Sequence, residues 1–468
     1  MLILFIRITS KLKQLKTIFF TLINNTFQDD GYALIYVLFI NLLIISALLA
    51  FLSLMFFYNI QSIKILSKTK LDWACYSAAQ LAALDSINIK NSNYIIKVDS
   101  INVSVTEDLF GLYKMITTSA KFNNDSSVYQ CFFSTAIIPA FANSLVISHP
   151  NAAVTVAGET NISGNILLTS NNVTRGNIFG IRNSTENYLN GDVIINDSVK
   201  SNIYNASHVD ELFDFKSPNI QWNNITLEST TVDRNFLSLN PPGQNYIVNG
   251  DLKIRDSLFN SDYRYYNFIV SGKVLFSSNC YSNINLIIRS SQDIVIDNNA
   301  HIENSILITK GKMNAEGTYA KTVQIYSEDS VSIKDSFFGY PSIILSYASA
   351  KDSAQLNRLV SINNSIINGT VMLLIPHIGM PNDKSKIFID DQSKVQGLVY
   401  SENNVESSGK ITGCVYTYNY WFYKDPGEYV NWLVNVNIDR KNLDKWFLTP
   451  VGFVGGNDYE MLDDKWIY

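Results

Sequence analysis

One stretch decides the fold of most of this chain: Ile294-Val295-Ile296-Asp297-Asn298-Asn299-Ala300-His301-Ile302-Glu303-Asn304-Ser305-Ile306-Leu307-Ile308. Two alternating apolar residues lead into a polar corner, one apolar residue leads into a second polar corner, and a second short apolar strand follows. Alternation with a period of two is typical of a strand that buries one face. Asn tolerates the positive φ of a tight corner. The stretch therefore predicts one coil of short strands joined by polar turns.

Degenerate copies of this pattern recur along the chain, in residues 153–168, 331–345 and 387–400. Short strands with turn residues at similar offsets are typical of a solenoid, in which each coil buries its inward residues by stacking on the next. The sequence predicts a parallel β-helix over residues 140–417, with less regular excursions near 205–245 and 350–358. A β-sandwich ranks second, because it needs longer strands and hairpin turns.

A different pattern precedes the solenoid. Residues 87–139 contain about four alternating segments separated by short turns, which predict a small antiparallel β-meander. Its expected strands are Tyr94–Val98, Ile101–Val105, Phe110–Ile116 and Val128–Phe133.

Residues 31–58 predict a transmembrane helix. No charged residue occurs between Asp30 and Lys64, and this run exceeds the roughly 20 residues that a helix needs to cross a hydrocarbon core. An apolar stripe continues through residues 59–86 with polar side chains on the other faces, so we expect one continuous helix whose second part is amphipathic. The small residues of that part would let a sheet pack closely: Ala78, Ala79, Ala82 and Ala83.

Residues 1–30 are expected to form a cytoplasmic leader, since their basic residues precede any acid. The large C-terminal part would then lie outside the cytoplasm. The apolar run is longer than the 7 to 15 residues of a secretory signal and lacks a small-residue cleavage site at its far end. A plain signal anchor is the simplest alternative reading.

The basic leader, Gly31, the uncharged run and the Ala-rich helical continuation together resemble the N-terminus of type IV pilins and pseudopilins. The resemblance implies cleavage after Gly31, which makes Tyr32 the first mature residue. This chain has Asp29-Asp30 where the family usually has a basic residue, and Tyr36 where it usually has Glu. In the family that Glu neutralises the free amine of a neighbouring subunit, so its absence resembles minor, tip-located pseudopilins.

The strand Phe110-Gly111-Leu112-Tyr113, together with the helix and the repeats, is similar to that of uncharacterised pilin-like bacterial envelope proteins. The last segment, residues 418–468, is rich in aromatic residues. We expect it to form a C-terminal cap over the open end of the solenoid. An exposed aromatic binding surface is the alternative. The fold class is therefore mainly β, with a long N-terminal helix, a meander and a capped parallel β-helix.

The net charge of −5 and the absence of a persistent Lys/Arg cluster argue against nucleic acid as a partner. The four cysteines contain no CxxC spacing that would suggest a metal site. An oxidising compartment would allow Cys75 and Cys131 to form a disulfide. The alternative is that Cys75, Cys131, Cys280 and Cys414 are all small buried apolar side chains.

The sequence predicts no enzymatic activity, and no catalytic residue, metal or cofactor. Polysaccharide-cleaving β-helices need paired carboxylates or a basic residue beside a calcium cluster. The acids with the highest local density fall at expected corners, where a solvated Asp is the default: Glu328, Asp329 and Asp335, and Asp383, Asp390 and Asp391. The four histidines are too dispersed for a triad or a metal centre: His149, His208, His301 and His377.

These features predict a single-pass protein of a bacterial inner membrane, a minor pilin-like or pseudopilin-like subunit of a type IV filament or secretion system. Its solenoid head would serve adhesion or substrate contact in the periplasm or at the cell surface. The expected partners are the lipid bilayer, other pilin-like subunits, and a surface polysaccharide or secreted protein. Two other functions remain open: a membrane-tethered polysaccharide-active enzyme, and a structural, self-stacking solenoid similar to the bactofilins.

Overall fold

The computed structural model describes residues 33–85, 93–122, 125–135, 138–170, 173–182, 187–215, 223–260, 264–348, 357–375, 383–444, 447–454 and 459–461. Two compact units divide the chain: Met1–Trp73 with Lys121–Ser127, and Ala74–Ala120 with Val128–Tyr468. Gly31, Tyr32 and the expected 1–30 leader lie outside the described residues.

The long helix α2 covers Ala33–Asp85, 53 residues, which confirms the expected continuous helix. It contains an apolar segment long enough to cross a membrane, within Ile35–Ala83, and no second such helix occurs in the described residues. Large apolar side chains from Ile35 to Leu66 are exposed. Exposed apolar surface of this extent is rare on a soluble protein and typical of a membrane-facing helix.

A small antiparallel sheet follows, with strand order β1-β2-β3-β4-β35, which confirms the predicted meander. Its strands are β1 (Asn93–Val98), β2 (Ile101–Phe110), β3 (Tyr113–Phe122), β4 (Asp125–Thr135) and β35 (Tyr459–Met461). The prediction of one strand over Phe110–Ile116 is wrong. Phe110 pairs with Tyr113, so Gly111 and Leu112 form a two-residue hairpin turn. Gly111 has φ +57°, which glycine adopts without steric cost.

The last turns of α2 pack on this sheet through small residues. Ala78, Ala79 and Ala82 are fully buried. The Thr118 hydroxyl of β3 donates to the Cys75 carbonyl at 3.0 Å, an approach that a larger side chain on this helix face would prevent. The expected close packing of sheet and helix is therefore present.

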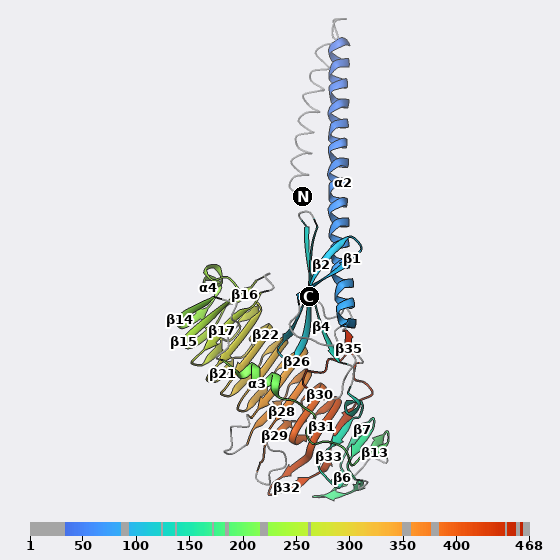
Figure 1. Cartoon of the computed structure of the whole chain (residues 1–468), viewed down its shortest axis with the longest axis vertical. Coiled ribbons are helices and arrows are strands. Elements are labelled where there is room, and N and C mark those ends of the chain that lie inside the picture. The colour runs from blue at the N-terminus through green and yellow to red at the C-terminus, as the bar shows by residue number, and fades with distance from the viewer. Residues whose placement is uncertain are drawn as a thin grey trace, which may run out of the picture. The chain divides into compact units, whose positions relative to one another are not determined.

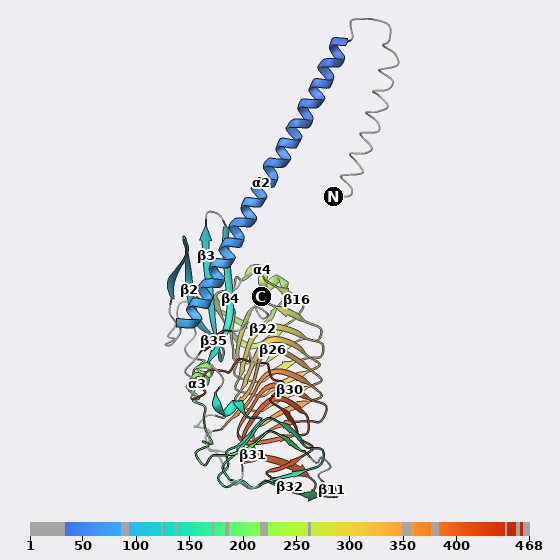
Figure 2. The ribbon, with the colours of Figure 1, turned by 90° about the vertical axis from the view of Figure 1, so that its right-hand side faces the viewer.

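The remainder is a parallel β-helix, which confirms the predicted fold class, and its strands form three faces. Figure 2 shows its coils stacked one on another. Several long strands bend across a corner and contribute to two faces. On face A the stacking order is β14 (Asn224–Val232), β15 (Gln244–Ile254), β17 (Tyr266–Val270), β20 (Leu286–Ser290), β22 (His301–Thr309), β24 (Tyr319–Ser327), β26 (Phe337–Tyr347), β28 (Ile366–Leu374), β30 (Lys394–Ser407), β31 (Lys410–Lys424), β5 (Leu145–Ile147), β8 (Ile166–Leu168) and β13 (Val193–Ile195).

Faces B and C are built from shorter segments. Face B adds β18 (Val274–Phe276), β21 (Ile294–Ile296), β23 (Met313–Glu316), β25 (Val331–Lys334), β27 (Leu359–Asn363) and β29 (Lys386–Ile389), and a parallel set of β33 (Trp432–Val434), β6 (Val154–Ala157) and β9 (Val173–Arg175). Face C adds β16 (Ser257–Phe259), β19 (Tyr281–Asn283), β34 (Asn437–Asp439), β7 (Asn161–Ser163) and β12 (Leu189–Asn190).

The stacking order differs from the chain order. The first coil along the chain does not begin the stack: β5 pairs with β31, and β7 pairs with β34. β14 therefore lies at one end of the stack and β13 at the other (Figure 1). Residues of the expected 418–468 cap are distributed: 432–439 form solenoid strands, β32 (Gly427–Val430) makes a hairpin with β31, and β35 joins the meander.

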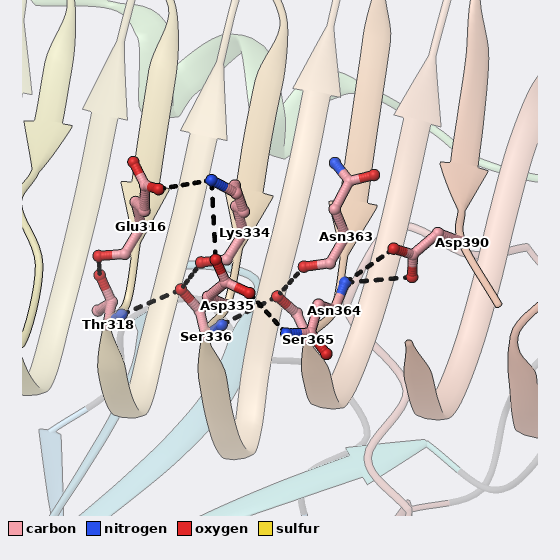
Figure 3. Close-up of polar contacts among 9 residues, drawn as sticks. All are labelled: Glu316, Thr318, Lys334, Asp335, Ser336, Asn363, Asn364, Ser365 and Asp390. Carbon is pink, nitrogen blue, oxygen red and sulfur yellow. Dashed lines mark hydrogen bonds and ion pairs between the residues drawn. The ribbon is translucent and has the colours of Figure 1, made fainter. Parts of the chain in front are cut away.

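Corners between faces B and C combine positive φ with a ladder of hydroxyls (Figure 3). The backbone N–H groups of Thr318 and Ser336 donate to the hydroxyls of Ser336 and Ser365, each at 3.0 Å. The residues in the left-handed conformation at these corners are Asp256, Asn279, Asn299, Gly317, Asp335 and Asn364. Asn, Asp and Gly tolerate this conformation best, which explains the polar corners of the repeat.

The interior is filled by aliphatic and aromatic side chains that point inward from all three faces. Outside face A, a second apolar cluster is covered by the Gly111-Leu112 turn, the short helices η1 (Pro139–Ala142) and α3 (Ser207–Phe213), and residues 447–453. Helix α4 (Arg234–Leu239) buries Phe236 against Tyr246 and Phe268 near the β14 end. A short hairpin joins β10 (Asn177–Ile178) to β11 (Ile181–Arg182). The outside of face C is left with two columns of outward side chains.

Candidate functional site

One outward column on face C consists of aromatic residues in successive coils. The parallel register places Tyr281 beside His301, His301 beside Tyr319, and Tyr319 beside Phe337. The column continues through Ile366 to Lys394, Lys410 and Asn437. We call these eight residues the ladder column. Their inward neighbours, such as Ala320 and Phe338, are fully buried, so the ladder residues point away from the core.

The rings of the ladder column lie against one another in series, in two tilted pairs and one stacked pair. Ring centroids are 4.3 Å apart for Tyr281 and His301, 4.5 Å for His301 and Tyr319, and 5.1 Å for Tyr319 and Phe337. Phe259 extends the stack at 5.0 Å from Tyr281. Aromatic pairs of this geometry contribute about 0.5–1.5 kcal/mol each beyond area burial.

Polar groups converge within the stack. Glu303 Oε1 lies 2.8 Å from His301 Nε2 and accepts a hydrogen bond from the Tyr281 hydroxyl at 3.3 Å. Partial burial, and secondarily the Glu303 charge, raise the pKa of Tyr281. Tyr281 is therefore held as a neutral donor to Glu303. The arrangement fixes the ring positions of Tyr281 and His301.

A pocket of about 240 Å³ lies where the stack ends at Phe337. The β26 strand is irregular there: Phe338 pairs with Ile367 and Ser342 pairs with Gly369, so three β26 residues oppose one residue of β28. The extra residues turn Tyr340 outward, and its ring lies 5.7 Å from that of Phe447. The Leu448 N–H donates to the Tyr340 hydroxyl. Bulges of this kind commonly re-aim a side chain beside a functional site.

The lining of the pocket combines aromatic side chains with amides and charged groups. It contains Tyr319, Lys321, Phe337, Gly339, Tyr340, Asn368, Gln396, Leu443, Asp444 and Phe447. Four of these residues form a second outward column on face C, each two residues after a member of the ladder column: Lys321, Gly339, Asn368 and Gln396. Gly339 carries no side chain, which leaves the floor of the pocket open.

These groups suit a ligand that is polar at its edges and apolar on its faces. The amides of Asn368 and Gln396 can each donate and accept hydrogen bonds, and aromatic walls with a few convergent polar groups are typical of ligand pockets. Among the described residues of the lining, Asp444 is the one carboxylate.

The acids that are most closely spaced in the sequence accept hydrogen bonds at corners of the solenoid. Asp390 accepts from the Asn364 N–H at 2.9 and 3.1 Å, and Asp335 accepts from the Asn364 amide (Figure 3). Asp329 accepts from the Ser330 N–H, and Asp383 from the Ser385 N–H. No group of three or more His, Cys, Asp or Glu side chains within the described ranges is placed to hold a metal ion.

The histidines and cysteines do not come together as a site. His149 packs against Tyr418, and His208 lies 3.9 Å from Glu211; His377 lies outside the described residues. Cys75 in α2 and Cys131 in β4 are both buried, and the disulfide between them stays a prediction. The processing residues Gly31 and Tyr32 also lie outside the described part of the chain.

The pocket was missed from sequence, although part of its signal was present. Each aromatic residue of the ladder column lies one residue before a buried position of the repeat: Tyr281, His301, Tyr319 and Phe337. An alignment of the coils by their inward residues would therefore have found the ladder column. The repeat pattern could predict neither the bulge at Gly339 nor the position of Phe447 in the pocket, because neither follows the period of the coils. No family model, curated protein or solved structure matches the chain.

Proposed function

We propose that this chain is a membrane-anchored, pilin-like envelope subunit whose solenoid head binds a polysaccharide in the face C pocket. The observation that carries the binding role is the pocket itself, in which aromatic side chains flank the amides of Asn368 and Gln396. A sugar ring has hydroxyls at its edge and C–H groups on its faces. Amides bind hydroxyls, and aromatic rings pack against apolar faces.

The anchoring role is supported by α2. Its length and apolar character suit a bilayer. Alanines in its last turns pack closely against an antiparallel sheet. A long N-terminal helix with a sheet on its second part is what the resemblance to pilins and pseudopilins implies. The proposed location is the inner membrane of a bacterium, with the solenoid outside the cytoplasm and other pilin-like subunits as partners.

Filling the pocket tests the binding role. A Cβ built on Gly339 meets Phe337 Cε1 at 3.3 Å and the Ala320 carbonyl oxygen at 3.5 Å, so the backbone accepts a side chain here with a small shift of one ring, and Gly339→Leu adds its bulk to the pocket. We expect this variant of the full chain in detergent to lose roughly tenfold or more in affinity for a glycan ligand found by array screening, since one or two lost hydrogen bonds have that effect.

Ser332→Leu is the matched control. Ser332 is an outward residue of β25 on face B, so this change adds the same side chain away from the pocket and should leave glycan affinity unchanged. Equal affinity of the Gly339 and Ser332 variants would refute the binding role, as would the absence of any glycan ligand.

Mass spectrometry of the mature N-terminus tests the pilin-like role separately. Processing as in pilins predicts a protein that begins at Tyr32 and co-purifies with other filament subunits. A protein that retains residues 1–31 and co-purifies with no filament component would overturn that role and leave a plain membrane anchor.

A further inference from the structure

Beyond the pocket, the ladder column changes from aromatic to basic. Phe337 is followed in register by Ile366, then by Lys394 and Lys410. Neighbouring strands lie about 4.8 Å apart, so Lys394 and Lys410 begin roughly 10 and 14 Å from Phe337 along the solenoid axis. The pocket and the lysines thus occupy one continuous strip of face C.

Lys394 and Lys410 are neighbours on adjacent strands, and both are exposed. Like charges directly opposite one another destabilise a sheet. Elsewhere on the solenoid such lysines are paired: Lys334 with Glu316 at 2.7 Å, and Lys386 with Glu406. No ion pair or hydrogen bond joins either ladder lysine to another described side chain.

Three acids of face C make contacts of their own, and one of them, Asp444, lies in the pocket lining. Glu303 lies beside His301 and Tyr281. Asp439, which follows Asn437 on β34, accepts from the Asn442 N–H at 3.2 Å and from its side-chain amide. Two adjacent ammonium groups therefore face solvent, and no carboxylate among the described residues forms an ion pair with either of them.

We propose that the polysaccharide is acidic and lies along the solenoid axis, with a sugar ring in the pocket and its carboxylates on Lys394 and Lys410. This rests on the proposed binding role of the pocket. A neutral glycan would use the pocket alone, whereas a uronate chain also relieves the repulsion between the two lysines. The ligand must be long enough to reach about 14 Å from Phe337, so affinity rises with chain length until both lysines are covered.

Oligogalacturonate and its methyl ester are the probes, because they differ in charge and share the sugar backbone. We expect the full chain in detergent to bind the acid roughly tenfold more tightly than the ester, since two exposed charge pairs of up to about 1 kcal/mol each give a factor of this size. The preference should shrink at high salt, which screens exposed charges.

Lys394→Ala with Lys410→Ala should abolish the preference and leave binding of the ester intact. Lys253→Ala with Lys312→Ala removes the same net charge from exposed positions, Lys253 lying on face B and Lys312 just before β23, and should preserve the preference.

Binding of acid and ester with equal affinity would overturn the inference while the proposed binding role stands. An unchanged preference in the Lys394/Lys410 variant would overturn it too. Binding of neither probe, together with failure of all other glycans, would overturn the binding role itself.

A polymer of glycerol phosphate, which has anionic groups but no sugar rings, separates the two parts of the site. We expect it to bind weakly and to be insensitive to Gly339→Leu. Binding as tight as that of oligogalacturonate would contradict the assignment of a polysaccharide.

Discussion

Glu402 is a buried carboxylic acid on face A, 3% exposed. Its Oε2 accepts from the Ile375 N–H at 2.7 Å, and its Oε1 accepts from the Tyr400 hydroxyl at 3.4 Å. These bonds favour the charged form only partly, and loss of solvation dominates, so the pKa of Glu402 rises to about 8. Around neutral pH this residue is therefore mostly protonated in the folded chain.

This shift makes stability depend on pH. The folded protein keeps the Glu402 proton up to about pH 8, whereas the unfolded chain releases it near its ordinary pKa of 4.5. The folded state binds more protons between these two values, so its stability falls as pH rises from 4.5 to 8 and levels off above 8.

Glu402→Gln keeps the shape and cannot ionise. We expect the variant to be more stable than the parent at pH 8.5, on the order of 5 kcal/mol, and to differ much less from it at pH 5. Urea unfolding midpoints of the full chain at the two pH values measure this. Glu316→Gln, at a half-exposed surface pair, is the control and should show no such pH dependence. An equal response of both variants would contradict the prediction.

At the scale of elements, the Gly111-Leu112 turn joins the meander to the solenoid. The Leu112 N–H donates to Gln324 Oε1 at 3.0 Å and to the Tyr326 hydroxyl at 3.1 Å, and the Gln324 amide donates to the Phe110 carbonyl at 2.7 Å. Gln324 is fully buried. A side chain that satisfies both a donor and an acceptor of one turn specifies where the meander docks.

Gln324→Leu keeps the volume and removes both hydrogen bonds to the turn, together with the one that Gln324 Oε1 accepts from the Tyr326 hydroxyl. The Phe110 carbonyl then loses its Gln324 donor, and a buried polar group without a partner costs about 1–3 kcal/mol. We expect a lower midpoint of thermal unfolding and faster proteolysis within residues 93–122. Gln396→Leu, at an exposed Gln of the same solenoid, should leave both measurements unchanged. Unaltered stability of the Gln324 variant would show that the turn is held by its apolar contacts alone.

The elements show how much of this fold and site could be predicted from sequence. The coils were predictable because their period of two and their polar corners are local properties, and residues such as Asn299 adopt the positive φ that the pattern required. The hairpin within Phe110–Ile116 was missed because its alternation continues through the turn. The pocket depends on a bulge at Gly339 and on Phe447, which lie more than a hundred residues apart in sequence. No local sequence pattern could predict that these two residues come together.

At the scale of the whole solenoid, the stack is closed by segments distant in sequence. The coil of residues 145–168 stacks on β31 and β34, so β7 pairs with residues near the C-terminus. An apolar end that would otherwise stay open is covered by the first coils of the chain. In a solenoid each coil is stabilised mainly by its direct neighbours, which makes the stability of residues 145–168 depend on residues 432–439.

A charge buried in β34 tests this dependence. Ile438 is fully buried and pairs with Ile162 of β7, and an unpaired carboxylate there would be strongly unfavourable. We expect Ile438→Asp to remove hydrogen-exchange protection from Asn161–Ser163 and Val154–Ala157, although these segments lie far away in sequence. Leu258→Asp is the matched control, because Leu258 is equally buried near the β14 end. That variant should lose protection in β16 and β19 and keep it in β7. Loss of protection in β7 in both variants would mean that the solenoid unfolds as one cooperative unit, and retention in both would contradict the stacking order itself.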